Sequence, residues 1–224
     1  MTKRKIEPIS LLLTDDDPIM RAGLRAVLAQ ASDINIVGEA KDGFEAQQMV
    51  GRLKPKILLL DLKMPGLSPA KLEKWVRENC PETITLVLTA HDRDAYLASM
   101  MEAGAAGYMA KGESTERLID AIRRAAQGEI VFDPEQFARA RRWQETVNQK
   151  MDSLTEREGE VLKLMAQGLT NKTIAKNLSI SNKTAAFHVS RILEKLGVDT
   201  RQKAVAWIHT HLSDTLDKSS DNKD

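Results

Sequence analysis

Five polar residues at the ends of short apolar runs are of types that could carry out phosphoryl chemistry together. Asp15 and Asp16 follow ISLLLT, Asp61 ends KILLLD, Thr89 ends TITLVLT, and Lys111 follows AGYMA. If these runs are parallel strands, their carboxyl ends meet at one edge of a sheet, which is where α/β folds bind ligands. The sequence therefore predicts a site with three carboxylates, a hydroxyl group and an ammonium group.

Three carboxylates at one edge repel one another, and a hard divalent cation with oxygen ligands is the usual way to hold them together. Mg²⁺ is the natural candidate because it keeps several waters and needs only a few protein ligands. A carboxylate beside Mg²⁺ is positioned to attack phosphorus, and Lys111 would offset charge on another phosphoryl oxygen. Asp61 is the candidate nucleophile.

Each of these residues also has an ordinary structural interpretation. Asp17 precedes Pro18, which is typical of a helix N-cap followed by proline at the first helical position, so we favour capping over metal binding there. Asp15 or Asp16 alone could be a turn residue, and Lys111 alone could be a solvated loop lysine. Their joint placement at the ends of separate runs favours a shared site.

The elements that must position this site alternate along the chain. The runs at 9–14, 34–40, 56–61, 83–89 and 106–110 are separated by segments of helical periodicity. The runs are continuous in apolar residues, as expected of strands covered on both faces. Residues 8–128 are therefore predicted to form a doubly wound α/β domain with a five-stranded parallel sheet.

The motifs LLLTDDDP, LLLDLKMPG, VLTAHD and GYMAKG resemble the flavodoxin-like receiver domains of two-component response regulators, over essentially residues 8–128. The resemblance implies that Asp61 accepts a phosphoryl group from a sensor histidine kinase. It implies that Asp16 ligates Mg²⁺ directly, that Asp15 helps through water, and that the backbone carbonyl of Lys63 is a further ligand.

The resemblance also implies a switch. Thr89 would turn its hydroxyl group to the bound phosphoryl group while Tyr108 swings inward, which changes the surface of the fourth and fifth helices and the fifth strand. Such a protein is not an enzyme with an external substrate; it catalyses only its own phosphorylation and a slow autodephosphorylation. Thr14, Asp17 and Gly112 depart from the commonest family pattern, but none of them removes a phosphotransfer group.

The pattern of strands stops after Gly128. Residues 129–152 carry few apolar residues and are predicted to be a partly helical linker. Residues 153–212 are helical throughout, and Thr155 with Glu158 forms the sequence pattern of a capping box. The polar tail 213–224 is predicted to be disordered.

Basic charge is concentrated in the helical part. Residues 172–203 contain seven Lys and Arg against two Asp and Glu, although the whole chain has a net charge of only +1. The turn SISN between a short helix and a longer basic helix is typical of a helix-turn-helix that reads the major groove. From charge alone, a small helical interaction domain with a solvated basic face is an equally open alternative.

Residues 154–205 resemble the LuxR-type DNA-binding domain, and its union with a receiver is typical of the NarL/FixJ group. The resemblance implies base-edge and backbone contacts to double-stranded DNA from Lys172, Lys183, Thr184, Ala186, Phe187, Ser190, Arg191 and Lys195. Ala186 and Ser190 are short, so we expect modest direct readout, with specificity that depends on DNA shape and half-site spacing. His188 is expected to pack in the core.

Composition limits the remaining possibilities. The single cysteine, Cys80, cannot form an intramolecular disulfide, which fits a reducing compartment. The basic N-terminus is followed by too short an apolar run for a signal peptide or a membrane span, so a cytoplasmic protein without a membrane partner is expected. Phosphorylation is expected to act either by uncovering the DNA-binding domain or by forming a receiver homodimer, and the sequence leaves both open.

Two other functions fit part of the pattern. An aspartate-nucleophile phosphatase of the haloacid dehalogenase type also has a strand that ends in Asp-x-Asp, as Asp15 and Asp17 do, but it normally carries a cap insertion where Gly112 here leads straight into a helix. A receiver that binds partners without phosphorylation is the second alternative. The presence of Asp16, Asp61 and Lys111 together disfavours it.

Overall fold

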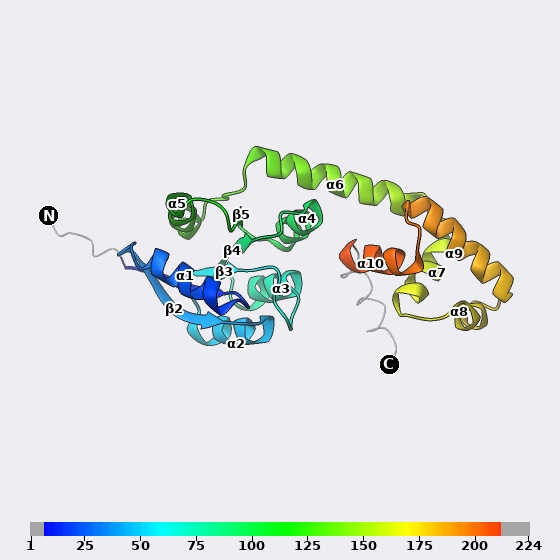
Figure 1. Ribbon diagram of the computed structural model, residues 1–224, viewed down its shortest axis with the longest axis horizontal. Helices are drawn as coiled ribbons and strands as arrows, with labels where there is room; N and C mark the ends of the chain where they lie inside the picture. Colours follow the sequence, from blue (N-terminus) through cyan, green and yellow to red (C-terminus); the bar gives the residue numbers. More distant parts are fainter. Residues whose placement is uncertain (1–6, 212–224) are drawn as a thin grey trace. The chain divides into compact units, whose positions relative to one another are not determined.

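The computed structural model describes residues 7–211. Contacts divide the chain into two compact units, with the division between Arg141 and Arg142. Within its described part, the first unit contains a sheet with helices on its faces, and the second unit is helical (Figure 1).

The first unit is built on five parallel strands in the order β2-β1-β3-β4-β5. Their bounds are Ile9–Thr14 (β1), Ile34–Ala40 (β2), Ile57–Leu60 (β3), Ile84–Thr89 (β4) and Gly107–Ala110 (β5). The central strands are almost entirely buried because helices cover both faces, which explains their continuous apolar sequences. The predicted doubly wound sheet is confirmed.

The helices form two layers. They are α1 (Pro18–Leu28), α2 (Gly43–Leu53), α3 (Pro69–Asn79), α4 (Asp94–Ala103) and α5 (Thr115–Ala126). Leu11, Leu13 and Leu59 pack in one core cluster with Leu28 of α1 and Ile122 of α5. Since successive side chains of a strand point to opposite faces, the alternate strand residues pack toward α2, α3 and α4.

Backbone pairing continues past the carboxyl ends of the strands and fixes the residues that follow. The amide of Asp61 donates to the carbonyl of Thr14 at 3.1 Å, and the amide of Lys111 donates to the carbonyl of Thr89 at 2.9 Å. Asp61 and Lys111 are therefore held by the sheet and not by free loops.

A long helix, α6 (Pro134–Asp152), follows the sheet of the first unit. The division between the two units falls within this helix. The helix begins with reciprocal hydrogen bonds: the amide of Gln136 donates to Asp133 Oδ1 at 2.8 Å, and the amide of Asp133 donates to Gln136 Oε1 at 3.1 Å. The predicted linker is therefore one continuous helix over this range.

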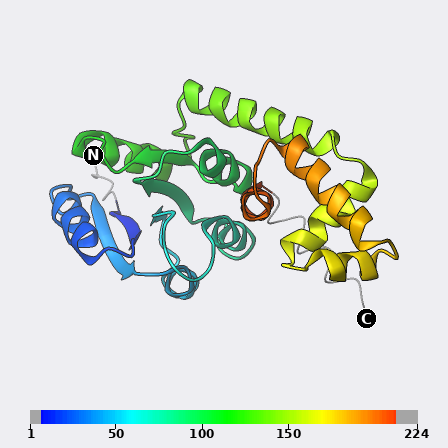
Figure 2. The same ribbon diagram turned by 45° about the vertical axis from the view of Figure 1, so that its right-hand side comes forward.

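The second unit contains α7 (Glu156–Ala166), α8 (Asn171–Asn177), α9 (Asn182–Leu196) and α10 (Arg201–His211) (Figure 2). Val161, Ile174, Ile192 and Ala204 bring one buried residue from each helix into a common core. The capping box of Thr155 and Glu158 is present as predicted. The predicted tail 213–224 lies outside the described residues, and among those described no helix is long and apolar enough to cross a membrane.

Candidate functional sites

The first candidate site is a buried ion cluster at the carboxyl edge of the sheet. Lys111 Nζ lies 2.6 Å from Asp15 Oδ2 and 2.9 Å from Asp61 Oδ2. Asp15 is 1% exposed and Asp61 is 4% exposed. The sheet thus brings Lys111 against residues that precede it by 50 and 96 positions in the sequence.

The charge of Lys111 is stabilised by its partners. Burial alone would lower the pKa of its ammonium group, but the hydrogen bonds to Asp15 and Asp61 outweigh burial and hold the pKa above its ordinary value. Lys111 is therefore a fixed cation next to Asp61.

Asp16 completes a set of carboxylates that could hold a divalent cation. One carboxylate oxygen from each of Asp15, Asp16 and Asp61 lies within 4.8 Å of the others. Among the described residues, buried Asp61 Oδ1 has no hydrogen-bond partner. A buried carboxylate oxygen without a donor is costly unless a cation or solvent satisfies it, so the donor set fits Mg²⁺.

The two other residues considered for the metal site, Asp17 and Lys63, have different outcomes. Asp17 Oδ1 accepts the amides of Ile19 at 2.8 Å and Met20 at 3.3 Å, so its side chain caps α1 as expected. Lys63 lies two residues after Asp61 with an exposed side chain. The role of its backbone carbonyl stays a prediction.

The two switch candidates, Thr89 and Tyr108, are both buried and both bonded to one segment. Thr89 Oγ1 accepts the amide of His91 at 3.1 Å, and Tyr108 Oη donates to the carbonyl of His91 at 2.8 Å. Burial raises the pKa of Tyr108 well above its ordinary value, so the phenol stays protonated and remains a donor. The backbone of His91 therefore links Thr89 at the end of β4 to Tyr108 of β5 through two hydrogen bonds.

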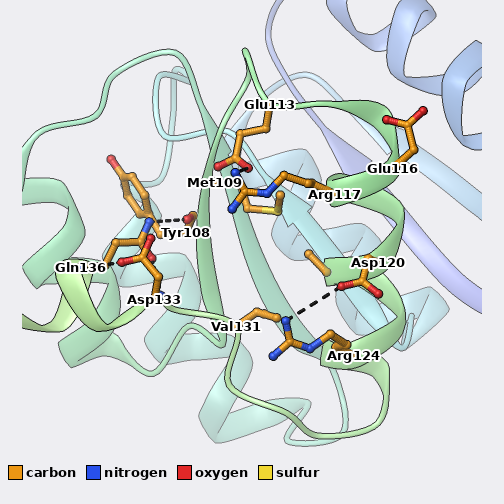
Figure 3. Close-up of a pocket in the computed structure, with 11 residues that line it drawn as sticks. Tyr108, Met109, Glu113, Glu116, Arg117, Asp120, Arg124, Val131, Asp133 and Gln136 are labelled. Atoms are coloured by element: carbon orange, nitrogen blue, oxygen red, sulfur yellow. Dashed lines mark hydrogen bonds and ion pairs between the residues drawn. The ribbon is translucent and has the colours of Figure 1, made fainter.

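The sequence did not indicate that the start of α6 contacts this region. Gln136 Nε2 donates to the carbonyl of Tyr108 at 2.8 Å. A dashed line marks this hydrogen bond in Figure 3. Arg139 binds the carboxylates of Asp92 and Asp94, which follow the turn at His91. The Asp133-to-Gln136 spacing is a capping-box pattern that could have predicted where the helix begins, but not what it contacts.

The second candidate site is the solvent face of α9 and the start of α8. The residues predicted to contact DNA that are exposed are Lys172, Lys183, Thr184, Ala186, Phe187, Ser190 and Arg191. Phe187 is 61% exposed, so its ring is accessible for an apolar contact. Thr184 also bonds Ser181 at the N-cap of α9, with 2.8 Å between their hydroxyl oxygens.

Lys195 differs from the other predicted DNA contacts because its ammonium group already has two partners. Its Nζ lies 2.6 Å from Glu158 Oε2 and donates to the carbonyl of Ser153 at 2.7 Å. The Lys195 ammonium group therefore ties α9 to α7, and we expect it not to contact a DNA phosphate. Burial would raise the pKa of Glu158, but Lys195 and the capping bonds hold it below its ordinary value.

His188, which was expected to pack in the core, lies at the edge of the buried face of α9. Ala185, Val189, Ile192 and Leu196 form the buried face of the helix, and His188 beside them is half-buried. Its Nδ1 is enclosed and has no hydrogen-bond partner among the described residues. His188 therefore packs at the margin of the core.

Two protein families match the chain, each over a different range of residues. Residues 11–123 match the family described as "Response regulator receiver domain". Residues 152–208 match the family described as "Bacterial regulatory proteins, luxR family". The receiver-domain match includes Asp15 and Asp17, the two residues on which the phosphatase alternative depended.

Similar proteins of nearly the same length carry both parts. The chain is 35% identical to the nitrate/nitrite response regulator protein NarL of Escherichia coli (strain K12), over 91% of this chain and 96% of NarL. It is 37% identical to YxjL of Bacillus subtilis (strain 168), named as an uncharacterized transcriptional regulatory protein, over 90% of this chain and 95% of YxjL. The structure of the two-component response regulator RcsB–DNA complex aligns with a TM-score of 0.63 at 28% identity, over 91% of this chain and 99% of the RcsB chain.

Proposed function

Because the chain belongs to the response regulators that join a receiver domain to a LuxR-type DNA-binding domain, we propose that it is a transcription regulator controlled by phosphorylation of Asp61. The observation that carries the proposal is the position of Lys111. Its ammonium group bridges Asp15 and Asp61, while Asp61 Oδ1 is left without a partner among the described residues.

These contacts support a defined transfer step. An oxygen of Asp61 attacks the phosphorus of a phosphohistidine on a sensor histidine kinase, an O–P bond forms, and the P–N bond breaks. The histidine nitrogen takes the electron pair of that bond and a proton. Lys111 is placed to bind a phosphoryl oxygen, because its ammonium group already lies against Asp61.

Asp15, Asp16 and Asp61 are the residues that would hold Mg²⁺, with the carbonyl of Lys63 as a further ligand. When bound, the ion supplies positive charge that offsets the charge on the phosphoryl oxygens during transfer. The side chains themselves position the ion and the nucleophile at the rigid edge of a sheet, which favours a fixed attack geometry. The protein phosphorylates only itself, and the acyl phosphate is lost slowly by hydrolysis.

The exposed face of α9 supports double-stranded DNA as the target. Lys172, Lys183 and Arg191 provide charge for phosphates, which gives affinity without sequence preference. Ala186 and Phe187 offer apolar contact to thymine methyl groups, and Ser190 discriminates weakly among bases. We therefore propose modest direct readout, supported by DNA shape and by the spacing of two half-sites in a homodimer.

DNA binding with and without a small phosphodonor tests this function. Full-length protein is titrated onto duplex DNA in Mg²⁺ buffer, and the expected result is tighter binding after donor treatment in the wild type but not in Asp61→Asn. Equal affinities in all samples would refute control by phosphorylation.

Oligomer mass measured on the same samples separates the two routes. Doubling of the mass with donor indicates receiver dimerisation, whereas an unchanged mass with tighter binding indicates release of the DNA-binding domain.

A further inference from the structure

The first two turns of α6 are attached to the first unit by packing as well as by polar contacts. The amide of Val131 donates to the carbonyl of Ala106 at 2.8 Å, directly before β5. Phe132 and Ala140 are buried. Within the helix, Gln136 and Arg139 lie close to Ala140, so one face of α6 makes the contacts of these three residues, and Val131 and Phe132 fix the segment just before it.

Arg139 makes the most specific of these contacts. Its Nη1 and Nη2 donate to the two carboxylate oxygens of Asp92 at 2.9 and 2.7 Å, and its Nε donates to Asp94 Oδ1 at 2.8 Å. The Arg139 side chain is only 22% exposed. A guanidinium group that is used bidentately and largely removed from water fixes geometry more strongly than a flexible surface ion pair does.

The carboxylates that Arg139 binds belong to the segment that follows the switch residue Thr89. Asp92 and Asp94 follow Thr89 by three and five residues, and His91, directly before Asp92, bonds both Thr89 Oγ1 and Tyr108 Oη. If Thr89 turns its hydroxyl group toward a phosphoryl group on Asp61, the amide of His91 must follow or lose its acceptor. The first change displaces the backbone next to Asp92, and the second removes a hydrogen bond that holds this backbone in place.

We propose that Arg139 is a positioning residue that locks segment 89–94 in its unmodified arrangement and thereby couples the state of Asp61 to the docking of α6. This proposal rests on the proposed function, because it assumes that the acceptor site receives a phosphoryl group. The same helix continues to Asp152, and Lys150 on it donates to the carbonyl of Leu196 at the end of α9 at 2.8 Å. The helix that Arg139 holds in the first unit thus continues into the second unit, where Lys150 and Leu196 lie.

Coupling of this kind is reciprocal. If modification of Asp61 weakens the contact of Arg139, then loss of that contact must favour the modified arrangement by the same factor. If the ion pair were merely structural, its loss would lower stability without changing the affinity of the acceptor site for a phosphoryl group. The affinity of Asp61 for a phosphoryl analogue is therefore the measurement that separates the two.

The experiment uses the full chain and beryllium fluoride with Mg²⁺, a tetrahedral mimic of a phosphoryl group on a carboxylate. We expect Arg139→Ala to bind the analogue about five-fold or more tightly than the wild type, the lower end of typical allosteric coupling. Arg142→Ala is the matched control, since Arg142 is an exposed arginine one turn further along the same helix. It should bind like the wild type.

Two further variants make the result specific. Arg139→Lys keeps one charged contact but not the bidentate one, so its affinity for the analogue should lie between those of the wild type and Arg139→Ala. The double variant D92N/D94N should act in the same direction as Arg139→Ala, and combining the two should add little because they remove one interaction. Hydrogen exchange without the analogue should be faster at the amides of 137–141 in Arg139→Ala and unchanged in Arg142→Ala.

The outcomes distinguish the two hypotheses. If the wild type fails to bind the analogue, or Asp61→Asn binds it equally well, the proposed function fails and exchange at 137–141 alone decides whether Arg139 holds α6. If the wild type binds it and Arg139→Ala binds equally or more weakly, the coupling is refuted while the function stands. Unchanged exchange at 137–141 in Arg139→Ala also refutes the proposal.

Discussion

Replacing Lys195 by methionine should destabilise the second unit and leave its interaction with DNA phosphates unchanged. Lys195 was predicted from the sequence to contact the DNA backbone, but its ammonium group is bound to Glu158 and to the carbonyl of Ser153. Methionine keeps most of the apolar stem and removes only the charge. The variant therefore isolates the ion pair from the packing of α9.

The magnitude follows from the burial of the pair. Removing one partner of a fully buried ion pair costs about 3–5 kcal/mol, because the other charge is left uncompensated. Here the Glu158 side chain is 6% exposed, the Lys195 side chain is 21% exposed, and Glu158 keeps its bond from the amide of Thr155. These features reduce the expected loss to about 2 kcal/mol, roughly a 30-fold change in the unfolding equilibrium.

Hydrogen exchange of the slowest amides in α7 and α9 of the full chain measures this loss at neutral pH. The pKa of Glu158 is lowered below its ordinary value of 4.5, so the ion pair contributes stability above pH 4.5 and loses it as the pH falls further. The difference between Lys195→Met and wild type should therefore shrink below that pH. A difference that is independent of pH would refute the ion-pair explanation.

Lys172→Met and Lys183→Met are the matched controls, because both lysines are exposed. Each should leave stability unchanged and reduce the slope of log K against log salt by about 0.9 for each bound protomer, the value for one lost phosphate contact. Lys195→Met should keep the slope of the wild type. A slope reduced in Lys195→Met as much as in the controls, with stability unchanged, would show that the structural assignment of Lys195 is wrong.

Two further predictions concern the metal and the DNA bases. Mg²⁺ at about 100 times its Kd should stabilise the first unit by about 2.7 kcal/mol in thermal unfolding, and Asp16→Asn should lose most of this gain. Asp17→Asn should keep it, because asparagine can still cap α1; equal gains in both variants would contradict the assignment of Asp16. On a duplex selected by the protein from random sequence, replacing contacted thymines by uracil should weaken wild-type binding by about 0.8 kcal/mol per buried methyl, roughly fourfold. Phe187→Ala should be less sensitive to the replacement than the wild type, and full sensitivity in this variant would refute apolar readout by Phe187.

The sequence predicted the sheet because physical constraints act locally on strands and on their ends. A strand covered on both faces must be apolar along its length, as Leu58–Leu60 are, and the carboxyl ends of parallel strands must share an edge. Asp15, Asp61 and Lys111 could therefore be placed together without a structure. Likewise, Asp17 before Pro18 and Thr155 with Glu158 have capping patterns that depend only on neighbouring residues.

What the sequence could not predict depends on partners that are distant in the chain. Lys195 resembles every other lysine of a basic helix, and only the packing of α9 on α7 brings it to Glu158. Arg139 lies in a stretch with few apolar residues, and helical periodicity gives its face but not the carboxylates that it binds 45 and 47 residues earlier. Long-range ion pairs of this kind leave no local pattern.

The intact mass of the full-length protein after treatment with a small phosphodonor and Mg²⁺ tests the central hypothesis most directly. The wild type should gain the mass of one phosphoryl group, and hydroxylamine should remove it, because an acyl phosphate is cleaved by that nucleophile. Asp61→Asn should gain none. A gain that persists in Asp61→Asn, or no gain in the wild type, would contradict the assignment of Asp61 as the phosphoryl acceptor.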